Sequence, residues 1–242
     1  MIPLRDINPT RRFPFINYAL IALNLVAFVL ELGLVSQHGT RATMNAYALV
    51  PVQLVSGAPG EEVTLLTSMF MHGGWEHLLW NMVFLWIFGD NVEDALGHVR
   101  YLIFYLGCGL AAAGAHIAVD PASAMPLVGA SGAIAGVLGA YVVLHPWARI
   151  VILNPFFPLW FVFGLTFVLP AWIVVGEWFV GNLLGGLGSL GARAGGGVAF
   201  FAHIGGFLAG LLAIRPLTAR RRPAELERWS GWRPPQRSSR AR

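Results

Sequence analysis

Apolar residues gather along this chain in six long runs, which polar or glycine-rich stretches separate. A helix needs about 20 apolar residues to cross a hydrocarbon core about 30 Å thick, and most of the runs come close to that length. The runs lie at residues 15–35, 75–96, 99–119, 131–144, 159–180 and 198–214. This pattern predicts an all-α polytopic membrane protein, built as a bundle of six transmembrane helices.

The composition points to the same class of protein. Hydrophobic residues make up 56% of the 242 positions and charged residues 12%. That charged share is about half of what a typical soluble domain contains. The first apolar run is too long for a cleavable signal peptide and has no clear small-residue cleavage site after it, so we interpret it as a retained helix.

The arginines predict the orientation of the helices. Arg5, Arg11 and Arg12 precede the first run, and nine arginines follow the last one. Positively charged segments stay on the cytoplasmic side, so both termini are expected there. The chain then divides into a cytoplasmic segment (1–14), a membrane domain (15–215) and a disordered basic tail (216–242). We expect this tail to meet anionic lipid headgroups rather than nucleic acid.

Two polar residues lie where a lipid-embedded helix should tolerate neither. Ser131 lies in Gly129-Ala130-Ser131-Gly132-Ala133, and His203 lies in Ala202-His203-Ile204-Gly205-Gly206. Polar groups at bilayer depth are costly unless paired, so they indicate a functional site. The predicted orientation places Ser131 and His203 in the outer half of the bilayer, together with His77 and Asn81. Because the run at 131–144 is short, we expect residues 120–130 to dip inward and to place Ser131 beside water.

Glycines at helical spacing predict that the two helices approach closely. Small residues at such intervals let helix backbones pack together. They are Gly132 and Gly136 in the fourth run, and Gly206 and Gly210 in the sixth. If these faces meet, the hydroxyl of Ser131 comes within hydrogen-bond reach of the imidazole of His203. Serine is a poor nucleophile until an adjacent base accepts its proton, and a neutral imidazole can do so.

Other catalytic and metal-binding motifs fail on spacing. Ala133 breaks the G-x-S-x-G pattern of soluble hydrolases, and H-E-x-x-H is absent. We therefore expect neither a metal nor a cofactor. Asp90, Glu93 and Asp94 lie at the cytoplasmic end of the second run, across the membrane from Ser131, and are interpreted as topology and capping residues. The expected site is a pair, Ser131 and His203, without a third carboxylate.

These motifs together resemble the rhomboid family of intramembrane serine proteases. The resemblance also includes His72 and the stretch His77-Leu78-Leu79-Trp80-Asn81, and it covers nearly all of the six-run core. It implies a rhomboid-like bundle with Ser131 as nucleophile and His203 as general base. It further implies an oxyanion hole formed by His77, Asn81 and the backbone N–H of Ser131.

The resemblance also carries expectations for the flanking segments. Residues 36–70 should form an amphipathic structure that lies partly in the outer leaflet. Trp178 and Phe179 should border the lateral route of the substrate as a gate, beside an alternative role in an interfacial aromatic belt. The chain departs from the family at Asn182, because many bacterial relatives have a glutamine shortly after the corresponding tryptophan.

The expected function is hydrolysis of a peptide bond in, or just outside, the transmembrane segment of another protein. The partners would be transmembrane substrates and the lipid bilayer, and the location would be a bacterial plasma membrane. Two alternatives stay open. One is a catalytically inactive rhomboid-like factor that binds membrane proteins or controls their quality. The other is a transporter with a proton pathway through His203 and His77, although the two halves show no inverted repeat.

Overall fold

The computed structural model is mostly helical and describes residues 1–154, 164–189 and 200–219. Within these residues, six helices overlap the predicted apolar runs. They are α1 (Phe15–His38), α5 (Trp75–Leu96), α6 (His98–Val119), α7 (Ser131–Leu144), α9 (Ala171–Ser189) and α10 (Phe200–Thr218). Four of the described helices, α1, α6, α9 and α10, have the length and hydropathy of a membrane-crossing helix, and α7 is a shorter apolar helix. The protein is an integral multi-pass membrane protein. The count of six crossings and the cytoplasmic termini stay predictions.

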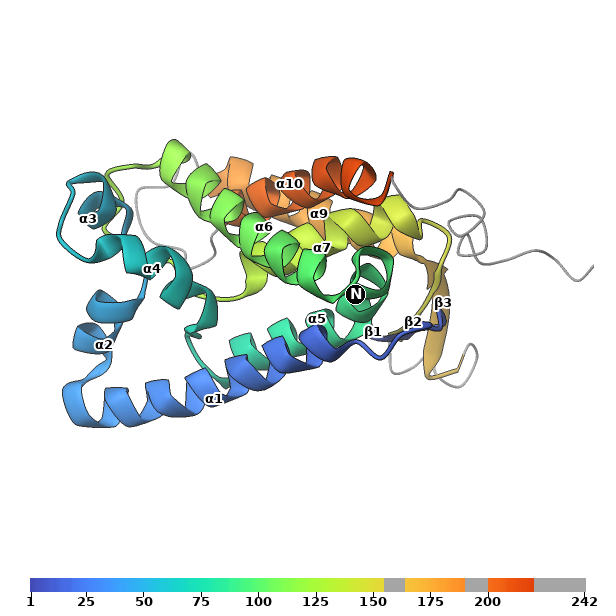
Figure 1. Cartoon of the computed structure of the whole chain (residues 1–242), viewed down its shortest axis with the longest axis horizontal. Helices are drawn as coiled ribbons and strands as arrows, with labels where there is room; N and C mark the ends of the chain where they lie inside the picture. Colours follow the sequence, from blue (N-terminus) through green and yellow to red (C-terminus); the bar gives the residue numbers. More distant parts are fainter. Residues whose placement is uncertain (155–163, 190–199, 220–242) are drawn as a thin grey trace, which may run out of the picture.

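Helix α7 forms the centre of the bundle. From Ala133 to Tyr141 every one of its residues is buried, and it packs against α5, α6, α9 and α10 (Figure 1). The outer helices expose large apolar side chains, such as Val29 and Leu30 of α1. An apolar outer surface around an apolar core suits a protein whose solvent is lipid.

The boundaries of the fifth and sixth runs differ from the prediction. The fifth was expected at 159–180, but Thr166–Pro170 is strand β3 and helix α9 begins only at Ala171. Pro170 therefore ends strand β3 and does not lie inside this helix. The start of the predicted run, 159–163, lies outside the described residues. Helix α10 continues to Thr218, three residues into the predicted tail, and residues 220–242 lie outside the described part of the chain.

A three-stranded antiparallel sheet was not expected from the all-α reading. Strand β2 (Arg149–Leu153) lies between β1 (Ile2–Asp6) and β3. Asp6 pairs with Ile150, and Phe167 pairs with Ile152. Strand β1 is far from β2 and β3 in sequence, and each strand is only five residues long, so none has a recognisable pattern until its partner is known. The sheet lies at one end of the bundle, beside the N-terminus (Figure 1).

The opposite end of the bundle carries short helices. These are α2 (Thr40–Tyr47), α3 (Pro51–Val55), α4 (Glu61–Thr67) and the 3-10 turn η1 (Ser68–Phe70). Leu49 pairs with Leu127, and the carbonyl of Ser68 accepts from the N–H of Gly129 at 2.8 Å. The segment at 36–70 therefore holds the loop that leads into α7.

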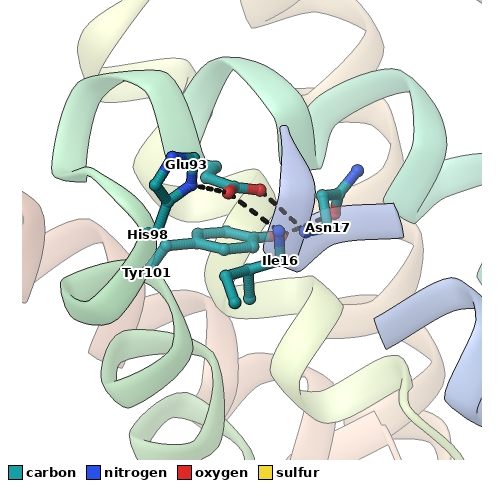
Figure 2. A network of polar contacts seen from close by, with 5 residues as sticks. All are labelled: Ile16, Asn17, Glu93, His98 and Tyr101. Atoms are coloured by element: carbon teal, nitrogen blue, oxygen red, sulfur yellow. Dashed lines mark hydrogen bonds and ion pairs between the residues drawn. The ribbon is translucent and has the colours of Figure 1, made fainter. Parts of the chain in front are cut away.

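A buried carboxylate joins α1, α5 and α6 (Figure 2). Glu93, near the end of α5, is only 1% exposed. It accepts from the backbone N–H groups of Ile16 at 2.9 Å and Asn17 at 2.7 Å, and it also contacts Nδ1 of His98. The first N–H groups of a helix have no partner within it, so Glu93 caps α1 from a neighbouring helix. The side chain of Asn17 in turn accepts from the hydroxyl of Tyr101.

Candidate active site

Ser131 and His203 meet as the glycine pattern predicts. Ser131 is the first residue of α7, and His203 lies in the first turn of α10. The Oγ atom of Ser131 lies 2.8 Å from Nε2 of His203. Both side chains are half-buried, so neither is sealed inside the core. A hydroxyl that donates to an imidazole nitrogen at this distance is arranged to lose its proton to that nitrogen.

The close approach of α7 and α10 produces this contact. A Cβ atom placed on Gly206 would overlap the carbonyl oxygen of Gly132, and one placed on Gly210 would overlap that of Gly136. The two helices therefore touch backbone to backbone along this face. His203 precedes Gly206 by one turn and Ser131 precedes Gly132 by one residue, so the packing of the glycines sets the distance between the two side chains.

The turn before α7 exposes the start of that helix. Gly129 has φ +118°, which side-chain-bearing residues rarely adopt. A Cβ atom at this position would also lie 2.6 Å from Cε1 of His77. The backbone N–H groups of the first turn of α7 have no partner within the helix and carry its positive end. The N–H of Ser131 is one of these groups, so it can bind an anionic oxygen.

His77 and Asn81 present two further donors one turn apart on α5. The N–H of Gly73 donates to Nδ1 of His77 at 3.4 Å, which leaves Nε2 to carry the ring proton beside Gly129. Asn81 is 6% exposed, and its Nδ2 atom has no hydrogen-bond partner among the described residues. A buried N–H without a partner is costly to the fold, so such a group suggests a ligand or a catalytic role.

Helix α9 covers the other face of His203. The ring of Trp178 lies 5.6 Å from the imidazole between centroids, and Phe179 stacks on Phe207 at 4.4 Å. Asn182 contributes a contact that the sequence analysis missed, since Nδ1 of His203 lies 2.6 Å from its Oδ1 atom. Asn182 is not a carboxylate, which is the usual orienting partner of a catalytic histidine. A polar residue one turn after Trp178 on an apolar helix was the available signal.

The acidic residues of α5 lie far from this site. Sixteen residues separate His77 from Glu93 on one helix, which corresponds to about 24 Å at 1.5 Å per residue. Glu93 caps α1, and Asp94 accepts from the backbone N–H of Arg11 at 3.2 Å. Within residues 1–154, 164–189 and 200–219 no group of three or more His, Cys, Asp or Glu side chains is arranged to hold a metal ion.

Comparison with known proteins places this arrangement in a family. Rhomboid protease GluP of Bacillus subtilis is 36% identical over 127 residues, which cover 52% of this chain and 24% of the relative. Rhomboid protein 1, mitochondrial, of Saccharomyces cerevisiae is 27% identical over 203 residues, or 81% of this chain and 51% of the relative. Rhomboid-like protease 5 of Toxoplasma gondii is 32% identical over 159 residues, or 63% of this chain and 16% of the relative.

The chain thus spans about half of these relatives or less. The model of the rhomboid domain matches residues 59–220, which include the glycine-packed helices and both polar residues at their contact. Because that match extends over well more than half of the chain, this protein belongs to the rhomboid family.

Proposed function

We propose that this protein is an intramembrane serine endopeptidase that cleaves transmembrane segments of other membrane proteins. The observation that carries the proposal is the 2.8 Å contact between Oγ of Ser131 and Nε2 of His203. Two of the relatives above, from Bacillus subtilis and Toxoplasma gondii, are named as proteases, which supports the same activity.

The proposed reaction begins with attack of Ser131 on the carbonyl carbon of the scissile peptide bond. Nε2 of His203 accepts the hydroxyl proton as the new C–O bond forms. The resulting imidazolium returns the proton to the leaving amine, and the C–N bond breaks. Water then attacks the acyl-enzyme and gives a proton to His203, the ester bond to Oγ of Ser131 breaks, and His203 returns the proton to Ser131 as the acid product leaves.

The developing oxyanion needs donors that are already in place. We assign this role to the backbone N–H of Ser131, Nε2–H of His77 and the amide of Asn81. The Nδ2 atom of Asn81 supports this assignment, because it is a buried donor without a partner among the described residues and can donate to the oxyanion. Removing one such donor typically costs about 2.7 to 4 kcal/mol of transition-state stabilisation.

A transmembrane substrate must unwind before its carbonyl can be attacked, because a regular helix keeps its carbonyls in internal hydrogen bonds. We therefore expect cleavage beside helix-breaking Gly or Pro residues, with a small residue at the scissile position. The proposed location is a bacterial plasma membrane with both termini in the cytoplasm. The sheet, which lies beside the N-terminus, would then face the cytoplasm and Ser131 the outer half of the bilayer.

Trp178 and Phe179 are proposed as the gate through which the substrate reaches Ser131. Trp178 also contacts His203, so its removal would disturb the base as well as the gate. Phe179 stacks on Phe207 and gives the cleaner test. Phe179→Ala should raise the cleavage rate in detergent without loss of folding. Unchanged or reduced rates in a folded variant would rule out the gate.

The proposed activity is tested with purified protein in detergent and a fluorescent single-span peptide that carries a small residue followed by Gly-Pro. Wild-type protein should cleave the peptide, and Ser131→Ala and His203→Ala should each abolish cleavage. Ser36→Ala and His38→Ala serve as matched controls, because both residues are exposed at the end of α1. Full activity in folded Ser131→Ala or His203→Ala would overturn the proposal.

A further inference from the structure

We propose that Asn182 is a positioning residue for His203, so that the Ser–His pair is supported by a third side chain. This inference rests on the proposed protease function. Its geometric basis is the contact between Nδ1 of His203 and Oδ1 of Asn182 at 2.6 Å, on the side of the imidazole opposite Ser131. Both ring nitrogens of His203 are thus engaged, one by each partner.

The amide of Asn182 is itself held in one orientation. Its Nδ2 atom donates to the backbone carbonyl of Trp178 at 2.8 Å, one turn earlier on α9. A flipped amide would direct its oxygen at this carbonyl, which cannot donate, and would lose the bond to Trp178. Oδ1 therefore faces His203, where it can only accept.

An acceptor at Nδ1 selects the tautomer that the reaction needs. Nδ1 must carry the proton that it donates to Asn182, so Nε2 keeps a free lone pair toward Ser131. The other tautomer would leave Oδ1 of Asn182 without a donor and would present Nε2–H to the hydroxyl of Ser131. Asn182 thus acts on the reaction through His203, without contacting the reacting atoms.

The packing of α9 on α10 holds this contact in register. Gly185 lies against Phe200, Asn182 against His203, and Trp178 against Phe207. The contacts run in opposite directions along the two helices, so these helices are antiparallel neighbours. The ring of Trp178, tilted by 43° to the imidazole, and the amide of Asn182 reach His203 from consecutive turns of α9. Together they restrict both the tilt and the rotation of the imidazole.

The neutral amide has a further consequence during the reaction. The imidazolium that forms after proton transfer keeps donating to Oδ1 of Asn182, and a hydrogen bond to a charged group is stronger than one to a neutral group. The hydrogen bond between His203 and Asn182 therefore becomes stronger as the transition state is approached. It should appear in kcat rather than in KM, because it does not depend on substrate binding.

Three variants separate this role from a purely structural one. Asn182→Leu keeps the approximate volume and removes the acceptor, and we expect kcat to fall about 10- to 100-fold with little change in KM. Asn182→Asp restores an acceptor and adds a negative charge. Leu184→Ala, on the exposed face of α9, is the matched control and should behave like wild type.

The pH dependence of kcat/KM is a further test, because it would not change if Asn182 only filled space between the helices. The other titratable groups whose charges act on His203 are His77 of α5 and His116 of α6. In Asn182→Asp a carboxylate is added to this set and favours the imidazolium, so the acidic limb of the kcat/KM profile should move to higher pH by about one unit. The variant should also recover most of the activity lost in Asn182→Leu when each is measured at its own optimum.

A second readout does not depend on cleavage. In protein labelled with ¹⁵N at the imidazoles, His203 should show the Nδ1–H tautomer in wild type and a mixture in Asn182→Leu. The resonance is identified by its absence in His203→Gln. This measurement decides the positioning role even if the chosen peptide is not cleaved.

The outcomes distinguish this inference from the proposed function. If Ser131→Ala abolishes cleavage while folded Asn182→Leu keeps wild-type kcat and tautomer, the protease proposal stands and the positioning role is wrong. If Asn182→Leu raises KM and leaves kcat unchanged, Asn182 is a substrate contact and the inference is also overturned. If wild type has no activity that depends on Ser131, the protease proposal fails, and the tautomer alone decides the orientation of His203.

Discussion

The proposed site depends on which polar groups have hydrogen-bond partners and which do not. The hydroxyl of Ser131 lies 2.8 Å from Nε2 of His203, and the Nδ2 atom of Asn81 is buried without a partner among the described residues. Unpaired donors reduce stability but can bind charge that develops only in the transition state. Activity and stability should therefore respond in opposite directions at such positions.

Asn81→Leu tests this opposition. We expect kcat/KM to fall about 100-fold because one oxyanion donor is lost. The melting temperature in detergent should stay constant or rise, because an unpaired buried N–H is removed. Asn24→Leu is the control, since Asn24 is also buried but donates to Leu20 within its own helix, far along the chain from the site. Wild-type kinetics in Asn81→Leu would remove Asn81 from the oxyanion hole.

A second residue predicts how stability depends on pH. Burial raises the pKa of the Asp6 carboxyl from its ordinary value near 3.8 to about 7, with a smaller contribution in the same direction from Asp90. Between these values the folded protein keeps a proton that the unfolded chain has released. The free energy of unfolding should therefore fall as pH rises from about 4 to about 7 and then level off.

Asp6→Asn should flatten this part of the stability curve. The measurement is thermal unfolding in detergent across that pH range, with Asp120→Asn as the control because Asp120 is exposed at the end of α6. Asparagine can still accept the hydrogen bond from the hydroxyl of Tyr141 that Asp6 accepts at 2.7 Å. An unchanged slope in Asp6→Asn would show that other groups cause the dependence.

At the level of elements, the contact between α7 and α10 determines whether the site exists. Backbone carbonyls of α7 occupy the space that side chains would need at Gly206 and Gly210. A flexible side chain could move aside, but a helix backbone cannot do so without shifting the whole helix. A displacement of α10 would carry His203 away from Ser131 and would also disturb its contact with Asn182 on α9.

Gly206→Ala is therefore predicted to be far more harmful than its single added methyl suggests. Overpacking of this kind costs about 1–3 kcal/mol, and cleavage should be largely lost even where the protein still folds. Gly114→Ala is the matched control, because a Cβ atom there meets nothing within 4 Å. That variant should keep full activity and gain slightly in stability. Comparable activity in the two variants would contradict the backbone-contact account.

At the scale of the whole molecule, two sets of hydrogen bonds, those of the β-sheet and those of the Glu93 cap, hold the N-terminal part of the chain against the bundle. Strand β1 joins the sheet through β2, which follows α7, and Glu93 caps the start of α1 from α5. Both lie at the end of the bundle away from α2–α4 (Figure 1). Helix α7 can therefore pack at the centre, while polar contacts at the periphery fix the position of α1.

Glu93→Ala should lower the stability of the protein without changing the rate of cleavage by the folded fraction. Two backbone N–H groups of α1 would lose their acceptor in a buried setting, at a cost of about 2–4 kcal/mol. The melting temperature in detergent should fall, while kcat of the remaining folded protein should stay near that of wild type. Glu76→Ala, an exposed residue of the same helix, should change stability by no more than about 0.5 kcal/mol. Equal melting temperatures for the two variants would show that the cap is not needed.

The sequence by itself determined the class of the protein, the approximate helices and the residues that meet at the site. Long apolar runs and glycines at helical spacing are local signals, since each depends only on residues that are close in the chain. Ser131 and His203 were therefore recognisable as polar exceptions in apolar, glycine-rich segments. The sequence also predicted a topology or capping role for Glu93. It did not indicate which helix Glu93 caps.

Only the tertiary structure decided the contacts between segments that are distant in sequence. Strands β1, β2 and β3 become strands because they pair with one another, and β3 displaced the expected start of the fifth helix from residue 159 to Ala171. The contact of Asn182 likewise depends on the register of α9 against α10, which places its amide oxygen at Nδ1 of His203. Periodicity along one helix specifies which residues share a face, but the neighbour that this face meets is set by the packing of the whole bundle.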